Sequence, residues 1–109
     1  MNIPFSPPDI TEEEIEAVAE VMRSGWITTG PKTKELERKM AEFTHTNRGV
    51  CLNSATSCME MALRLFEIGP GDEVIVPAYT YTASASVVCH VGATLRLVDV
   101  EKGKFHIDY

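Results

Sequence analysis

A short run of small polar residues at the start of a predicted helix is the segment of this sequence best suited to bind an anion. The run Asn53-Ser54-Ala55-Thr56 follows the apolar residues 50–52. Amide N–H groups at a helix N-terminus lack intrahelical acceptors and carry partial positive charge, so serine and threonine hydroxyls beside them complete a cradle for phosphate. The same residue types cap helices whatever the function, so this motif alone leaves both interpretations open.

A second segment places aromatic rings after another apolar run. It reads Pro77-Ala78-Tyr79-Thr80-Tyr81-Thr82-Ala83. Either tyrosine could pack against a sheet, or it could offer a flat apolar wall to a planar ligand. A phosphate cradle beside an aromatic platform indicates a phosphorylated planar cofactor.

A third segment, Trp26-Ile27-Thr28-Thr29-Gly30, joins two threonine hydroxyls to the only tryptophan of the chain. It could contact a polar substrate, or it could be a plain connection between two helices with a buried tryptophan.

Other kinds of site find little support. No G-x-x-x-x-G-K-[ST] or G-x-G-x-x-G run is present, which argues against a nucleoside triphosphate or dinucleotide. The three histidines and three cysteines share no metal-ligand spacing, so we expect no metal site. Because the cysteines lie in apolar segments, we predict buried free thiols at Cys51, Cys58 and Cys89.

The elements that would position these residues can be read from spacing and turn signals. Thr11-Glu12-Glu13-Glu14 is a capping-box signature that predicts a helix ending at Gly25. A loop over residues 26–33 and a helix over 35–43 follow. In the rest of the chain we predict strands at residues 50–52, 73–76 and 94–100. Helices are predicted between them, at residues 56–66 and 83–91. This order indicates an α/β fold with a mainly parallel sheet, whose face the 56–66 helix would cover. Residues 105–109 resemble the approach to a further helix.

Four of these segments, in this order, resemble the DegT/DnrJ/EryC1/StrS family of pyridoxal-phosphate-dependent sugar aminotransferases. The likeness runs from Ile3-Pro4-Phe5 to Phe105-His106-Ile107-Asp108, and the four segments are Ser24-Gly25-Trp26-Ile27-Thr28-Thr29-Gly30-Pro31, Val50-Cys51-Leu52-Asn53-Ser54-Ala55-Thr56-Ser57, Gly71-Asp72-Glu73-Val74-Ile75-Val76-Pro77 and the tyrosine segment. The resemblance implies a partial three-layer sandwich, the N-terminal part of the large domain of a fold-type-I pyridoxal phosphate (PLP) aminotransferase.

The same resemblance implies how the chain is organised. Members are several hundred residues long, so these 109 residues would form a single partial domain at the N-terminus. Within it, residues 1–10 would be an extended arm, 11–47 the N-terminal helices and active-site loop, and 48–109 the start of the PLP-binding large domain.

Cofactor contacts follow from the resemblance residue by residue. The backbone amides of Ala55 and Thr56, with the hydroxyl of Ser54 or Thr56, would hold the cofactor phosphate. Tyr81 stands where the family has an aromatic residue stacked on the pyridine ring.

Substrate contacts in the same family would come from Thr28 and Thr29, near the sugar end of the active site. The lysine that forms the Schiff base with PLP, and the acidic residue that holds the pyridine nitrogen, follow later in the family than residue 109. The five lysines of this chain match no such position, so we assign no catalytic residue.

The activity that the resemblance implies is transfer of an amino group, usually from glutamate, to a keto group on a nucleotide-linked sugar in amino-sugar biosynthesis. A homodimer is implied, because sites of this family are assembled from two subunits. Some members are instead dehydratases, with histidine in place of the lysine. A third alternative is a truncated, non-catalytic binding or oligomeric product. We expect no catalysis by the chain alone.

Composition limits the partners and the location. With 44% hydrophobic and 24% charged residues the chain has an ordinary globular balance, and its net charge of −6 argues against a nucleic-acid surface. No apolar run reaches the roughly 18 residues that span a bilayer, and the start lacks the features of a signal peptide, so we expect a cytoplasmic protein. A parallel sheet of few strands leaves exposed edges, so we expect a homodimer or higher self-association.

Overall fold

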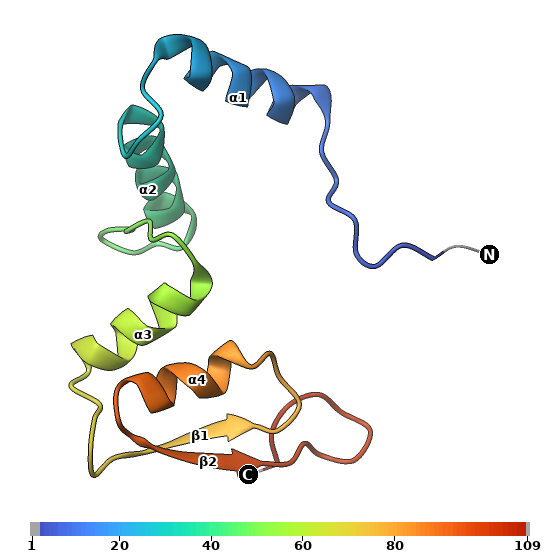
Figure 1. The fold of residues 1–109 in the computed structure, drawn as a ribbon, viewed down its shortest axis with the longest axis vertical. Coiled ribbons are helices and arrows are strands. Elements are labelled where there is room, and N and C mark those ends of the chain that lie inside the picture. Colours follow the sequence, from blue (N-terminus) through green and yellow to red (C-terminus); the bar gives the residue numbers. More distant parts are fainter. Residues whose placement is uncertain (1–2, 109) are drawn as a thin grey trace. The chain divides into compact units, whose positions relative to one another are not determined.

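The computed structural model describes residues 3–108, which hold four helices and one two-stranded sheet (Figure 1). The chain divides into two compact units, Met1–Cys51 and Leu52–Tyr109. Met1, Asn2 and Tyr109, at the ends of the predicted arm and of the 105–109 segment, lie outside the described residues.

The first unit begins with helix α1, Glu12–Ser24, as the capping box predicts. The Glu14 carboxylate accepts the backbone N–H of Thr11 at 2.7 Å, and hydrogen bonds from the Thr11 hydroxyl and N–H lower the pKa of Glu14. Gly25 ends the helix in the left-handed conformation, at φ 73°, which costs glycine little because it has no Cβ. Both predicted ends of this helix are confirmed.

Helix α2, Pro31–Phe43, starts earlier than residue 35, so the prediction of a loop as far as residue 33 was wrong. The reason is Pro31, whose fixed φ suits the first helical position, where an amide N–H would lack an acceptor anyway. Neither helix of this unit has a buried residue. Their apolar faces are exposed at Ile15, Val18, Met22, Leu36, Met40 and Phe43.

The second unit contains helix α3 (Ala55–Leu65), strand β1 (Glu73–Pro77), helix α4 (Ala83–His90) and strand β2 (Thr94–Val98). The two strands are parallel, in a register that pairs Glu73 with Thr94 and Pro77 with Val98. The predicted α/β class and parallel sheet are therefore confirmed.

Helix α4 forms the centre of this unit, because it contacts α3 and both strands (Figure 1). The buried apolar side chains are Val76, Ala83, Val87 and Val88. The expectation that the 56–66 helix covers the sheet was wrong: α3 packs on α4, and its Leu65 is exposed. Helix α4 covers one face of the sheet, while Ile75 of β1 and Leu97 of β2 remain exposed.

The predicted strand at residues 50–52 was also wrong, since these residues form no strand and Val50 is exposed. A strand needs a hydrogen-bonding neighbour, and the two strands of the described residues pair only with each other. Strand β2 stops at Val98, short of the predicted residue 100. Beyond this strand, Ile107 forms an isolated antiparallel bridge with Val100.

All three cysteines are free, but the prediction of burial was wrong for Cys58 and Cys89, which are exposed, while Cys51 is half-buried. Cys58 and Cys89 lie on faces of α3 and α4 that no described element covers. Among residues 3–108, no helix combines the length and apolarity needed to cross a membrane.

Candidate functional site

The predicted phosphate cradle lies at the N-terminus of α3. Ser54 is the N-cap, with extended backbone, and Ala55 and Thr56 are the first two helical residues. The first intrahelical bond runs from the Cys58 N–H to the Ser54 carbonyl at 3.1 Å. The amides of Ala55 and Thr56 therefore have no acceptor within the helix and are available to an anion.

The two hydroxyls of this turn have different partners. Ser54 Oγ accepts the Ser57 N–H at 3.1 Å and donates to Ser57 Oγ at 3.0 Å, so it is engaged as a helix cap. The half-buried Thr56 has no side-chain hydrogen bond in the part of the chain that the structure describes. Of the two hydroxyls that the sequence left open, Thr56 is thus the one free to meet a ligand.

The two tyrosines of the second segment also differ. The ring centroids of Tyr79 and Phe105 lie 6.0 Å apart with the planes tilted by 34°, a contact typical of paired aromatic rings. Tyr81 is 81% exposed, and its carbonyl accepts the Ser84 N–H at 2.9 Å at the start of α4. Tyr79, itself 73% exposed, thus has an aromatic neighbour, whereas Tyr81 has none among the described residues.

Both segments lie at one end of the second unit. The N-termini of α3 and α4 lie on the side where β1 and β2 end (Figure 1), the side on which open α/β sheets bind ligands. No hydrogen bond among the described residues joins Ser54 or Thr56 to Tyr81. The shared packing of α3 against α4 is what brings the two segments to the same end.

A polar contact that the sequence did not single out links these two helices. Glu60 Oε2 of α3 lies 2.9 Å from His90 Nδ1 of α4, and Arg64 donates to Glu60 Oε1 at 2.7 Å. The hydrogen bonds from Arg64 and then from His90 lower the pKa of Glu60. Glu60 and Arg64 are four residues apart, a spacing at which side chains of one helix can pair. The contact between Glu60 and His90 could not be predicted from spacing, because these two residues lie on different helices.

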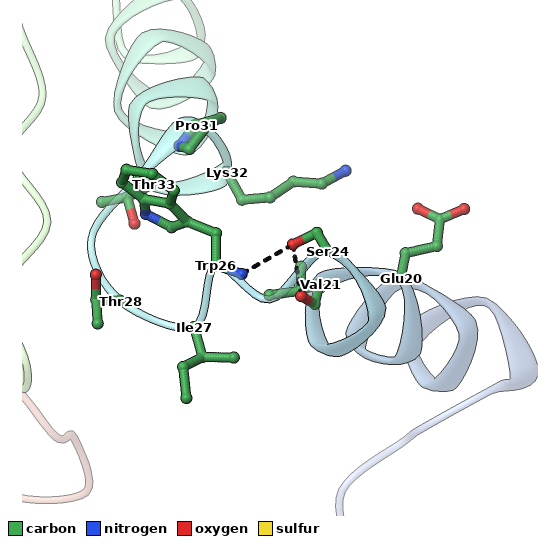
Figure 2. A pocket seen from close by; sticks show the side chains of 10 residues that line it. Glu20, Val21, Ser24, Trp26, Ile27, Thr28, Pro31, Lys32 and Thr33 are labelled. Atoms are coloured by element: carbon green, nitrogen blue, oxygen red, sulfur yellow. Dashed lines mark hydrogen bonds between the residues drawn. The ribbon is translucent and has the colours of Figure 1, made fainter.

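The third segment lies in the first unit and borders a pocket of about 490 Å³ (Figure 2). Thr28 lines this pocket and Thr29 does not. Trp26, which was expected to be buried if the segment were a plain connection, is 59% exposed. The pocket also has a lysine and a glutamate that the sequence did not single out, Lys32 and Glu20.

Among residues 3–108, no group of three histidine, cysteine, aspartate or glutamate side chains is placed to hold a metal ion. Two of the lysines are engaged in ion pairs within their own segments. Lys39 Nζ lies 2.7 Å from Glu35, and Lys104 pairs with Glu101.

A family profile, that of the DegT/DnrJ/EryC1/StrS aminotransferase family, matches residues 8–109. A protein of Streptococcus pneumoniae described as a sugar aminotransferase, Spr1654, is 64% identical, with a TM-score of 0.91 over the whole of this chain. It has been solved in apo, PMP and PLP forms. This chain covers 27% of that structure's chain, so it spans about a quarter of the relative's length.

Two further solved structures widen the comparison. An aminotransferase of Psychrobacter cryohalolentis is 36% identical over 91% of this chain and 26% of its own, with a TM-score of 0.81. A GDP-4-keto-6-deoxy-D-mannose-3-dehydratase of E. coli with bound hydrated PLP is 25% identical over 98% of this chain and 29% of its own, with a TM-score of 0.86. These matches confirm the expected N-terminal part of the PLP aminotransferase fold. The chain belongs to the DegT/DnrJ/EryC1/StrS aminotransferase family.

Proposed function

We propose that this chain forms the N-terminal part of a PLP-dependent aminotransferase that acts on nucleotide-linked keto sugars in amino-sugar biosynthesis. The observation that carries the proposal is the N-terminus of α3, where the amides of Ala55 and Thr56 lack intrahelical acceptors beside the unbonded Thr56 hydroxyl. Glutamate is the proposed amino donor, and the proposed assembly is a cytoplasmic homodimer.

The residues of the α3 N-terminus fit the cofactor phosphate. The Ala55 and Thr56 amides and the Thr56 hydroxyl would donate hydrogen bonds to it, while Ser54 holds the helix turn in shape. The exposed ring of Tyr81 would cover one face of the pyridine ring and exclude water from it. When bound, PLP serves as the electron sink for chemistry at the amino group. In the first unit, the loop with Thr28 and Thr29 would contact the sugar.

By itself, the 109-residue polypeptide is proposed to be inactive. Its site residues bind and orient, but the lysine that the chemistry requires has no counterpart among its five lysines.

A dehydratase of the same family is the second candidate. The observation in its favour is the E. coli relative, a dehydratase whose structure matches 98% of this chain. The two activities differ at the residue that takes the place of the lysine, so the part of the fold described here suits either.

A chimera provides the test. Residues 1–109 replace the matching segment of the S. pneumoniae protein, which is 64% identical to them. We expect the chimera to bind PLP, seen as a visible absorption band, and to convert a nucleotide-linked keto sugar to an amino sugar with glutamate as donor. The 109-residue chain alone is expected to show neither the band nor turnover.

Each outcome tests a different part of the proposal. A folded chimera that binds PLP but does not aminate the keto sugar, beside an unmodified S. pneumoniae protein that does, would refute the proposed sugar contacts of residues 1–109. A folded chimera that binds no PLP, beside an unmodified S. pneumoniae protein that does, would refute the proposed cradle. Turnover by the isolated chain would refute its proposed inactivity.

A further inference from the structure

The connection between α1 and α2 is held in shape by its own contacts. Among the described residues, the backbones of α1 and α2 do not pack against each other, although side chains of both helices line the same pocket. The Trp26 backbone N–H donates to Ser24 Oγ at 3.2 Å, and the Ser24 hydroxyl donates to the Val21 carbonyl at 2.7 Å (Figure 2). The Trp26 indole Nε1–H donates to the Thr29 carbonyl at 3.1 Å. Trp26 is therefore bonded back to the end of α1 and forward to the approach to α2.

Gly30 leaves the space that the Trp26 ring occupies. A Cβ atom on this buried glycine would lie 2.1 Å from Nε1 and 2.4 Å from Cδ1 of Trp26, far inside the contact distance of non-bonded atoms. The backbone at Gly30 is extended, at φ −165°, which any residue can adopt. The position therefore needs glycine for space and not for backbone freedom. We call the indole hydrogen bond and the ring contact with Gly30 the Trp26–Gly30 interlock.

The interlock separates the roles of two adjacent threonines. Thr28 lines the pocket of about 490 Å³ together with Val21 and Ile27. Thr29 does not line it, and its carbonyl accepts the indole N–H. Thr28 thus borders the pocket, while the backbone of its neighbour Thr29 holds the Trp26 ring.

We propose that Trp26 is a positioning residue, which acts through the Thr29 carbonyl and Gly30 to hold the connection in the conformation that presents Thr28 to the pocket. A short connection between two helices whose backbones do not pack together would otherwise adopt several conformations, and binding would have to offset the entropy of ordering it. The inference rests on the proposed function only where it takes the ligand of the pocket to be the sugar part of the substrate.

The test uses the 109-residue chain, in which Trp26 is the only tryptophan, so its indole N–H gives a single NMR signal. Gly30→Ala is compared with Gly69→Ala, because a Cβ on Gly69 meets nothing nearer than a backbone oxygen at 3.6 Å. We expect Gly30→Ala to abolish the protection of the indole N–H from solvent exchange and to shift the amide signals of Thr28 and Thr29. The far-UV circular dichroism of the helices should be retained. Gly69→Ala should leave the indole and threonine signals unchanged.

Two results would overturn the proposal: indole protection that survives in Gly30→Ala, or protection that is lost while the Thr28 and Thr29 signals stay in place. If Gly30→Ala also loses its helix signal, Trp26→Phe decides, because it keeps an aromatic ring but has no donor for the Thr29 carbonyl. Shifted threonine signals in that variant support the proposal, and unshifted ones overturn it. None of these measurements needs a cofactor or substrate, so failure of the proposed function would appear separately, in the chimera.

Discussion

At the scale of single residues, two hydroxyls at the N-terminus of α3 differ in their hydrogen bonds, although the sequence could not tell which of them caps the helix. Ser54 is occupied as the helix cap, whereas the Thr56 hydroxyl has no partner among the described residues. A cap and a ligand contact respond differently to substitution, because a cap needs only an acceptor for an amide while a phosphate contact needs a donor.

Substitutions at Ser54 test the cap. Ser54→Ala should destabilise the chain by about 1 kcal/mol, because the Ser57 amide loses its acceptor. Ser54→Asp should keep the stability, since aspartate caps well, but should weaken PLP binding in the chimera through repulsion of the phosphate. Urea unfolding and PLP titration measure the two effects. Equal PLP affinity in Ser54→Asp and the parent would contradict a phosphate at this position.

Substitutions at Thr56 test the contact with the cofactor phosphate. Thr56→Val keeps the shape of the side chain but removes the hydroxyl donor, so PLP binding by the chimera should weaken by about tenfold or more, with little change in stability. Thr56→Ser, which keeps the hydroxyl, is the matched control and should bind PLP nearly as well as the parent. If the valine variant binds as tightly as the serine variant, the hydroxyl makes no contact with the cofactor.

Thr28 and Thr29 permit a third comparison at this scale. In the chimera, Thr28→Val should raise the KM for the sugar substrate by about tenfold and change kcat less, because Thr28 lines the pocket. Thr29→Val should raise the KM by less, since Thr29 contributes a backbone carbonyl, which the substitution retains. Steady-state kinetics at saturating glutamate measures both, and a larger effect at Thr29 would reverse the assignment.

At the scale of elements, the contact between α3 and α4 brings the two candidate ligand-binding segments to the same end of the second unit (Figure 1). Glu60 on α3 bonds to His90 on α4, while Arg64 bonds to the same carboxylate. The pKa of Glu60 is lowered from its ordinary value of 4.5, chiefly by the hydrogen bond from Arg64. The ionised carboxylate therefore stabilises the folded chain above pH 4.5, and this contribution is lost as the pH falls through the lowered pKa.

Glu60→Gln should consequently lower the urea midpoint near neutral pH, and its difference from the parent should shrink as the pH falls below 4.5. Glu67→Gln is the control, because Glu67 forms no ion pair within residues 3–108. Circular dichroism follows the unfolding at each pH. A difference between Glu60→Gln and the parent that stays constant into acid would show that the carboxylate charge contributes nothing.

At the scale of the whole molecule, both units expose large apolar side chains, such as Phe43 in the first and Phe66 in the second. Burying this surface would be favourable, while the net charge of −6 opposes association. We expect the isolated chain to self-associate, and to do so more strongly when salt screens the repulsion. Analytical ultracentrifugation at low and high salt measures this. A monomer under both conditions would refute the expectation.

Features that depend on local chemistry could be predicted from neighbouring residues alone. The capping box at Thr11, the left-handed stop at Gly25 and the strand–helix–strand order from β1 to β2 are decided by neighbouring residues, and the structure confirms each. The order and spacing of the short motifs also pointed to the family, which the comparisons confirm. The candidate anion site was recognisable for the same reason, since a helix N-terminus is a local feature.

Features that depend on partners distant in the chain could be learned from the three-dimensional structure alone. Residues 50–52 are apolar enough for a strand but have no strand beside them, and α3 packs on α4 instead of on the sheet. Which hydroxyl caps α3, which threonine lines the pocket, and the bond from Glu60 to His90 are likewise set by geometry. Spacing along a chain specifies which groups can meet locally, whereas packing selects which distant groups do.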